Sequence, residues 1–189
     1  MQDIRGAPAT LETWQAPLWS AQLTAHALPA AVPPRTMGDI LATLGLADVD
    51  GMRAMLVAWD RLLAAIRPDA VAAEFAPALM LAARGRVPVL ALGTGFSLPP
   101  AHLPAFPSLT GQPAAHRETR LLDGLNRALA KTGRSPLSAL PQIFAAEHSL
   151  AAVFREFDPY RAWRTHHAPP SLARAVPPAS GNGEEVFVY

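Results

Sequence analysis

The sequence predicts an α/β domain built on a doubly wound, mainly parallel sheet. Two short apolar runs, residues 69–75 and 87–92, each have the length and composition of a buried strand. A short helical run, residues 77–84, separates them, with Pro77 at its first position and Gly85 just past its end. Two strands joined by one helix form a βαβ unit, in which the strands lie parallel and the crossover is right-handed.

The composition predicts a single globular domain. The chain has 189 residues, of which 50% are hydrophobic and 16% are charged, a balance typical of folded rather than disordered protein. The formal net charge of +1 argues against nucleic acid or an anionic membrane as a partner held by charge. The sequence contains no cysteine, which excludes disulfides, thiolate metal sites and cysteine nucleophiles.

The N-terminal region shows no secretion signal. Residues 1–14 lack a basic segment followed by an apolar core. The apolar runs of the chain are shorter or more interrupted than the roughly 20 residues that cross a bilayer. We therefore expect a soluble, cytoplasmic protein without a transmembrane segment.

The chain before the βαβ unit is expected to hold two helices. Residues 11–16 can form a strand, but the surrounding pattern is weak. Thr36 can cap a helix that begins at the next residue, and Asp48 or Asp50 can cap a second helix that runs to Ile66. The apolar residues of this second helix recur at spacings of three and four, which is the period of an amphipathic helix.

The chain after the βαβ unit is expected to add helices and a third strand. Residues 98–113 are rich in proline and form either a surface loop or the wall of an apolar pocket. An amphipathic helix is predicted over residues 114–132 and a short helix over residues 137–145. Residues 150–154 are predicted to be the third strand, and residues 185–189 look like the beginning of another.

The candidate site lies where the two strands of the βαβ unit end, because ligands of parallel α/β sheets bind outside the carboxyl ends of the strands. In the segment after the second strand, the two glycines allow the backbone to approach a ligand closely. The hydroxyls of Thr94 and Ser97 can hydrogen-bond a ligand, and the ring of Phe96 can line an apolar pocket. The segment is a weak candidate for a phosphate-binding loop, since it has neither the dinucleotide-binding fingerprint nor a Gly-Lys-Ser/Thr sequence. The candidate residues are Glu74 and Phe75 after the first strand and Gly93, Thr94, Gly95, Phe96 and Ser97 after the second.

Simpler interpretations of these residues stay open. Glu74 is either a functional carboxylate or a strand-end charge that is solvated or caps the helix at Pro77. The segment from Gly93 to Ser97 is either a binding loop or a tight turn. The histidines carry little signal, and surface positions are expected for His26, His102, His116 and His148. The adjacent pair His166-His167 lies in a loop without nearby carboxylates, so no metal site and no cofactor are expected.

Three segments resemble bacterial UDP-glycosyltransferase-like proteins of the GT-B fold. Residues 67–100, RPDAVAAEFAPALMLAARGRVPVLALGTGFSLPP, are similar to the central part of the N-terminal domain of that family, where a strand with an acidic end is followed by APTALLAARGLGIP and then by GTGF and prolines. Residues 149–160, SLAAVFREFDPY, resemble a later strand that ends in Phe-x-Glu-Leu-Asp/Glu. Residues 181–189, GNGEEVFVY, resemble the linker into the C-terminal domain. The resemblance covers about residues 36–189, and the order of the segments is its main support.

The resemblance implies a fold and a reaction. Residues 1–183 would be an incomplete, Rossmann-like N-terminal acceptor domain, and residues 184–189 would begin a truncated C-terminal donor domain. The family transfers a sugar from a nucleotide donor such as a UDP-sugar to a hydroxyl-bearing acceptor without a metal. This chain would supply mainly the acceptor side, with Gly93 to Ser97 and Phe75 as acceptor-binding residues.

The resemblance also assigns a catalytic role to Glu74. It falls where many family members carry the acidic partner of the catalytic histidine, although Asp is more usual there. A carboxylate bonded to an imidazole fixes its tautomer and stabilises the imidazolium, which helps the imidazole to deprotonate a hydroxyl. The first strand and the Gly-rich loop that carry this histidine in the family have no counterpart in the sequence.

Two other classes of protein remain as alternatives. The chain could be a non-catalytic α/β domain that binds a small apolar molecule or needs a partner chain to supply the donor half. It could also be an unrelated flavodoxin-like domain. If strands of the parent domain are missing, an apolar sheet edge is left exposed, which predicts self-association.

Overall fold

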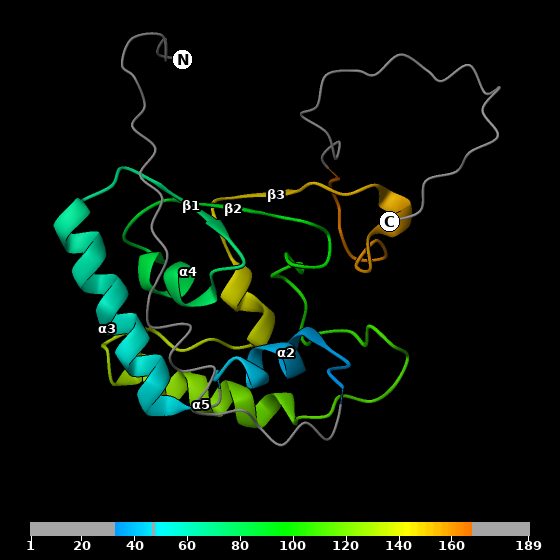
Figure 1. Cartoon of the computed structure of the whole chain (residues 1–189), viewed down its shortest axis with the longest axis horizontal. Coiled ribbons are helices and arrows are strands. Elements are labelled where there is room, and N and C mark those ends of the chain that lie inside the picture. The colour runs from blue at the N-terminus through cyan, green and yellow to red at the C-terminus, as the bar shows by residue number, and fades with distance from the viewer. Residues whose placement is uncertain (1–32, 47, 168–189) are drawn as a thin grey trace, which may run out of the picture.

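The computed structural model describes residues 33–46 and 48–167 (Figure 1). Within these ranges it holds a three-stranded parallel sheet in the order β1–β2–β3, together with four α-helices and two 3₁₀ helices. The strands are β1 (Val71–Glu74), β2 (Val89–Gly93) and β3 (His148–Ala151). The predicted α/β class is thereby confirmed. The predicted strands at residues 11–16 and 185–189, and the domain boundary at 184, lie outside the described residues.

The predicted βαβ unit is present with shorter strands. β1 leads into α4 (Pro77–Ala83), and β2 returns parallel to β1, with Val71 opposite Val89 and Glu74 opposite Leu92. Pro77 occupies the first turn of α4, where its missing N–H costs no hydrogen bond. Gly85 takes a φ of +69°, a conformation that suits glycine, and so lets the chain turn back towards β2.

The two predicted helices before the sheet are confirmed. α2 (Met37–Thr43) begins with a capping box, in which the Thr36 hydroxyl accepts the backbone N–H of Asp39 and the Asp39 carboxylate accepts the N–H of Thr36. α3 (Val49–Ile66) begins at Asp48, whose side chain accepts the backbone N–H of Asp50. Of the two predicted capping residues, Asp48 and Asp50, Asp48 is therefore the one that caps α3.

The elements after β2 differ from their predicted limits. α5 (Glu118–Ala130) starts four residues later than predicted, and the backbone N–H groups of Ala115 and His116, just before it, are bonded to the Asp39 carboxylate. The short helix predicted over 137–145 is the 3₁₀ helix η1 (Leu140–Phe144).

The third strand also lies earlier than predicted. β3 pairs with β2 from His148, opposite Leu90, to Ala151, opposite Gly93. The prediction of residues 150–154 was wrong at its C-terminal end, because β2 ends at Gly93 and leaves no backbone for residues 153 and 154 to pair with. The chain instead enters the short 3₁₀ helix η2 (Arg155–Phe157).

The core lies between one face of the sheet and the helices. Figure 1 shows α2, α3, α4 and α5 on the same side of the three strands. The inner face carries the small side chains of Ala73, Ala91 and Ala151, against which every residue of α4 is buried. The described helices leave the outer face of the sheet uncovered, so a doubly wound arrangement stays a prediction. In the ranges that the structure describes, no helix is both long and apolar enough to cross a membrane.

Candidate functional site

The three strands end at one edge of the sheet, and the predicted site residues lie there. The pairing of Glu74 with Leu92, and of Gly93 with Ala151, shows that the carboxyl ends of β1, β2 and β3 are neighbours. The loop from Gly93 to Ser97 therefore follows β2 beside the end of β1. The structure thus brings the two predicted groups to adjacent strand ends, which is what ligand binding in parallel sheets requires.

Glu74 is an exposed carboxylate at this edge. It is the last residue of β1 and lies on the outer face of the sheet, as the alternation of buried and exposed residues along the strand shows. No side chain caps α4, so the interpretation of Glu74 as a helix cap is wrong. Among the described residues the Glu74 carboxylate has no hydrogen bond or ion pair, and a catalytic role for it stays a prediction.

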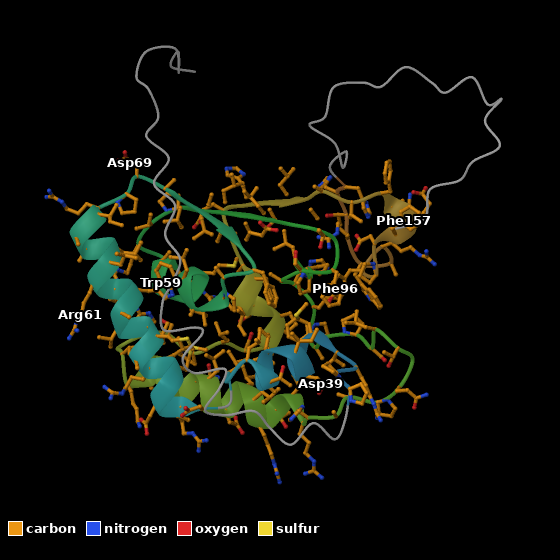
Figure 2. All side chains as sticks on the ribbon, in the orientation of Figure 1. Asp39, Trp59, Arg61, Asp69, Phe96 and Phe157 are labelled. Atoms are coloured by element: carbon orange, nitrogen blue, oxygen red, sulfur yellow. The ribbon has the colours of Figure 1, made fainter. Side chains whose placement is uncertain are left out.

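The two aromatic residues of the predicted site differ in accessibility. Phe75 has a φ of +40°, which is uncommon for a residue with a bulky side chain, and its ring stacks on Phe144 with a centroid distance of 6.3 Å. Its ring is half-buried and packs against the hydrophobic core. Phe96 is 47% exposed on the loop after β2 (Figure 2). Of the two predicted aromatic residues, Phe96 is therefore the one whose ring a ligand at this edge can contact.

The loop after β2 is held by reciprocal bonds between its two hydroxyl residues. The backbone N–H of Thr94 donates to Ser97 Oγ at 3.0 Å, and the N–H of Ser97 donates to Thr94 Oγ1 at 3.3 Å. The two hydroxyl oxygens lie 3.2 Å apart. A Cβ on Gly93 would lie 2.5 Å from Ser97 Oγ, so glycine makes room for this turn. Thr94 is exposed and Ser97 half-buried, which leaves a fixed pair of hydroxyls at the surface.

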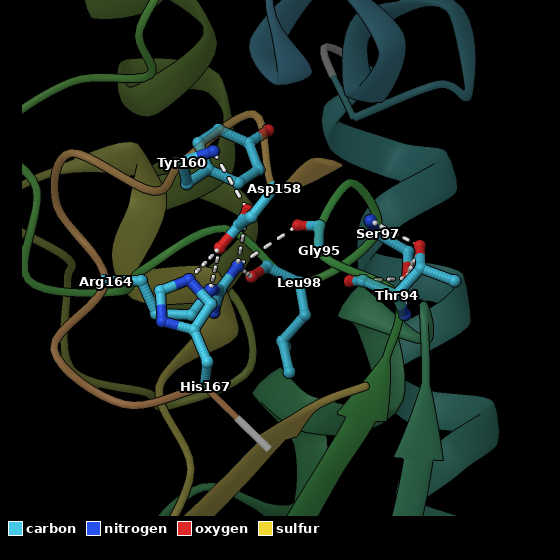
Figure 3. A network of polar contacts seen from close by, with 8 residues as sticks. All are labelled: Thr94, Gly95, Ser97, Leu98, Asp158, Tyr160, Arg164 and His167. Atoms are coloured by element: carbon cyan, nitrogen blue, oxygen red, sulfur yellow. Dashed lines mark hydrogen bonds and ion pairs between the residues drawn. The ribbon is translucent and has the colours of Figure 1, made fainter. Parts of the chain in front are cut away.

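A buried polar network fastens the end of the described chain to this loop (Figure 3). The Asp158 carboxylate accepts hydrogen bonds from the backbone N–H of Tyr160 at 2.9 Å and from Nε of Arg164 at 2.6 Å. One Nη of Arg164 also donates to the backbone oxygens of Gly95 at 3.1 Å and Leu98 at 2.8 Å. Arg164 thus connects the residues after β3 with the loop after β2.

The imidazole of His167 completes this network. Its Nε2 lies 3.0 Å from Oδ2 of Asp158, and its side chain is 18% exposed. Burial raises the pKa of Asp158, but hydrogen bonds from Arg164 and Tyr160 outweigh burial and hold that pKa below its usual range. Asp158 is therefore ionised at neutral pH. When neutral His167 donates Nε2–H to this carboxylate, its Nδ1 carries the free lone pair.

Gly95 allows the network to approach the loop closely. A Cβ at this position would lie 2.8 Å from Oδ1 of Asp158 and 2.9 Å from Cγ1 of Val153. Both distances are shorter than side-chain Cβ atoms tolerate. The glycine is therefore needed for packing rather than for an unusual backbone conformation, since its φ is not positive.

The hydroxyl of Tyr160 lies beside this network without a partner. The side chain is completely buried, and burial raises its pKa well above the ordinary value, so it remains a neutral phenol. In the described ranges it is the single buried side-chain polar atom without a hydrogen bond. An unmet buried hydroxyl costs free energy.

Sequence reasoning missed the network around Asp158. His167 does have a nearby carboxylate, so the expectation that none lies near the histidine pair was wrong for this residue. The available signal was the Asp158-Pro159-Tyr160 sequence, since aspartate before proline favours a turn in which the carboxylate accepts an N–H two residues on. The His116 side chain is 34% exposed, but its ring and backbone both bond Asp39, a contact that the sequence did not indicate. In the part of the chain that the structure describes, no three His, Cys, Asp or Glu side chains gather to hold a metal.

A cavity of about 500 Å³ lies away from this edge, at the amino end of β2.

Comparison of the chain with protein-family models, with curated proteins and with solved structures gave no match.

Proposed function

We propose that this chain is the acceptor-binding part of a glycosyltransferase-related protein, a Rossmann-like N-terminal domain of the GT-B type. The observation that carries the proposal is the grouping of Glu74 and the Gly93–Ser97 loop at the adjacent carboxyl ends of parallel strands. This is where ligands of such sheets bind. The resemblance of residues 67–100 to the family adds support.

Different residues at the carboxyl edge of the sheet contact different parts of an acceptor. The exposed ring of Phe96 offers an apolar platform for the acceptor body, and the hydroxyls of Thr94 and Ser97 offer hydrogen bonds to its polar groups. Phe75 supports the edge from the core side through its stack on Phe144. Gly93 and Gly95 keep the loop close to the strand end, so that the acceptor lies against the sheet.

Two carboxylates are available for proton transfer from the acceptor hydroxyl. Glu74 is exposed and unpaired among the described residues, so it can orient an imidazole supplied by another part of the protein or by a partner chain. The Asp158–His167 pair offers the same chemistry within the described chain, with Nδ1 of His167 as the proton acceptor. The nucleotide sugar would be held by a donor domain or a chain that supplies one.

The proposal is tested by equilibrium dialysis of the full 189-residue chain with a panel of phenolic acceptors and, separately, with UDP-glucose. We expect saturable binding of at least one acceptor and no binding of UDP-glucose. Phe96→Ala should weaken acceptor binding roughly tenfold, because an exposed aromatic contact contributes about 1 kcal/mol or more. Phe157→Ala removes an exposed ring from η2 instead and should leave binding unchanged. Binding of UDP-glucose without any acceptor binding would overturn the proposal.

A role for each proton-transfer residue is tested by single-turnover transfer from radiolabelled UDP-glucose, with the chain extended to include a donor domain. Glu74→Gln should lower the rate of transfer without changing acceptor affinity. His167→Gln separates the two candidate bases, since a loss confined to one variant assigns the role to that residue. Unchanged rates in both variants would exclude both residues from the reaction.

A second candidate function, a non-catalytic domain that works through a partner, is favoured by the outer face of the sheet. Leu90 is 38% exposed and Leu150 is 42% exposed on that face. Parallel sheets are normally covered on both faces, so this face is suited to contact with a second copy of the chain.

A further inference from the structure

A cavity separate from the strand ends lies among the C-terminal parts of three helices. It has a volume of about 500 Å³, which is within the range of small-molecule sites. Its walls come from α3, from α4 and the loop after it, and from α5 and the loop after it, elements that Figure 1 shows grouped below the sheet. Leu81, Leu129 and Leu137 provide an apolar floor.

The charged groups around this cavity are strongly biased towards positive charge. Arg84, Arg86 and Arg134 face it together with a single carboxylate, that of Asp60. Three guanidinium groups against one carboxylate leave a net charge of +2 on a protein whose overall net charge is +1. A concave wall focuses such a field and favours a negatively charged occupant.

The Asp60 carboxylate occupies only a few of the guanidinium N–H donors of the three arginines. Arg86 and Arg134 both bond the same oxygen of Asp60, Oδ1, through one Nη atom each. The guanidinium of Arg84 has no hydrogen bond or ion pair among the described residues. Each guanidinium has five N–H donors, so most of the donors around the cavity remain available to an anion.

Neutralising helix ends is a simpler role for these arginines, because the C-terminus of a helix carries partial negative charge. The last carbonyls of α4 and α5 are already bonded to the backbone that follows. The Ala83 oxygen accepts the N–H groups of Arg86 and Val87, and the Leu129 oxygen accepts those of Thr132 and Arg134. One guanidinium bond reaches a carbonyl here, from Arg134 to Thr132 at 3.3 Å. Helix ends therefore account for only a small part of the arginine donors.

We propose that this cavity binds a small organic anion, a phosphate or carboxylate group joined to an apolar body. The anionic group contacts Arg84, Arg86 and Arg134, and the apolar body lies on the leucine floor. Planar guanidinium groups pair well with both oxyanions, which makes arginine suited to either source of charge. The proposal is independent of the acceptor site, because the cavity adjoins the amino end of β2 and the acceptor loop follows its carboxyl end.

The test is an amide NMR titration of the ¹⁵N-labelled full chain at low ionic strength with phenyl phosphate, benzoate and inorganic phosphate in separate arms. Gly85 and Gly133 line the cavity and serve as reporters. We expect saturable shifts at both glycines with phenyl phosphate or benzoate, with a dissociation constant on the order of 1 mM or below. Inorganic phosphate should bind more weakly because it makes no contact with the floor. Equal affinity for inorganic phosphate and phenyl phosphate would overturn the assigned apolar subsite.

Substitutions decide whether the shifts report this site. Arg84→Gln removes an arginine that holds no other group in the described structure, and it should weaken binding roughly tenfold because charge-assisted hydrogen bonds are lost. Arg127→Gln makes the same charge change on the exposed side of α5, away from the cavity, and should leave affinity unchanged. Asp60→Asn removes the competing carboxylate and should tighten binding. Absence of saturation, or equal weakening by Arg84→Gln and Arg127→Gln, would overturn the proposal.

Discussion

Replacement of Gly95 by alanine tests the junction between the loop after β2 and the segment that follows β3. The new Cβ would lie 2.8 Å from Oδ1 of Asp158, 3.1 Å from its Cγ, and 2.9 Å from Cγ1 of Val153. The Asp158 side chain cannot simply turn away, because Arg164, His167 and the N–H of Tyr160 all bond it. The clash must therefore be relieved by separating the two segments.

The size of the effect follows from what is separated. Overpacking of a filled site costs about 1–3 kcal/mol, and breaking a buried ion pair costs about 3–5 kcal/mol. The Asp158 side chain is fully buried and that of Arg164 is 9% exposed, but the pair would be strained rather than lost. We expect Gly95→Ala to lower the free energy of unfolding by about 2–4 kcal/mol, a large share of the stability of a typical domain.

The assay is urea unfolding followed by tryptophan fluorescence and far-ultraviolet circular dichroism. Gly38→Ala is the matched control, since its Cβ would lie 3.4 Å or more from its neighbours, which is ordinary van der Waals contact. Alanine within α2 also has the better helix propensity, so this control should be neutral or stabilising by up to about 1 kcal/mol. A Gly95→Ala protein within about 0.5 kcal/mol of the original would refute the close packing described for this junction.

Three further predictions concern other parts of the fold. Burial alone would raise the pKa of Asp39, but N–H groups of Ala115, Arg35 and His116 lower it to about 2, from 3.8. Ionised Asp39 therefore adds about 2 kcal/mol of stability above pH 4, and this stability is lost as the pH falls to 2. Asp39→Asn should remove this part of the pH dependence of urea unfolding. An unchanged pH dependence in the variant would contradict the role of Asp39. Arg164→Lys keeps the charge but loses the forked contacts, and should destabilise the protein by about 1–3 kcal/mol in the same assay, where no change would show that the network adds nothing. The double substitution Leu90→Ser and Leu150→Ser should reduce concentration-dependent self-association in sedimentation velocity, and the idea of a sheet-face contact between copies fails if association is unchanged.

The local elements of the fold were predictable because each has a signal within a few residues. Thr36 with Asp39 forms a capping box, and Pro77 and Gly85 bracket α4. The limits of α5 and β3 were not predictable in the same way. The Asp39 carboxylate bonds the N–H groups of residues 115 and 116 just before α5 across more than 70 residues of chain, and the end of β2 decides where β3 stops. Such long-range backbone bonds leave no local pattern.

The candidate site was predictable only where a general rule for parallel sheets applies. The topological rule for parallel sheets placed Glu74 and the Gly93–Ser97 loop at neighbouring strand ends before any contact was known. It gave no means of finding the bonds from Arg164 to Gly95 and Leu98, which join residues 66 or more positions apart. It also did not separate Phe96, which is exposed, from Phe75, which packs on Phe144.

The measurement that tests the acceptor site most directly is an amide NMR titration of the ¹⁵N-labelled full chain with the phenolic acceptor that binds best in dialysis. We predict saturable shifts at Glu74 and from Gly93 to Ser97, with affinity weakened about tenfold in Phe96→Ala and unchanged in Phe157→Ala. Shifts confined to Gly85 and Gly133 would place the phenol in the arginine-lined cavity instead. That result, or the absence of any saturable shift, would contradict an acceptor site at the carboxyl edge of the sheet.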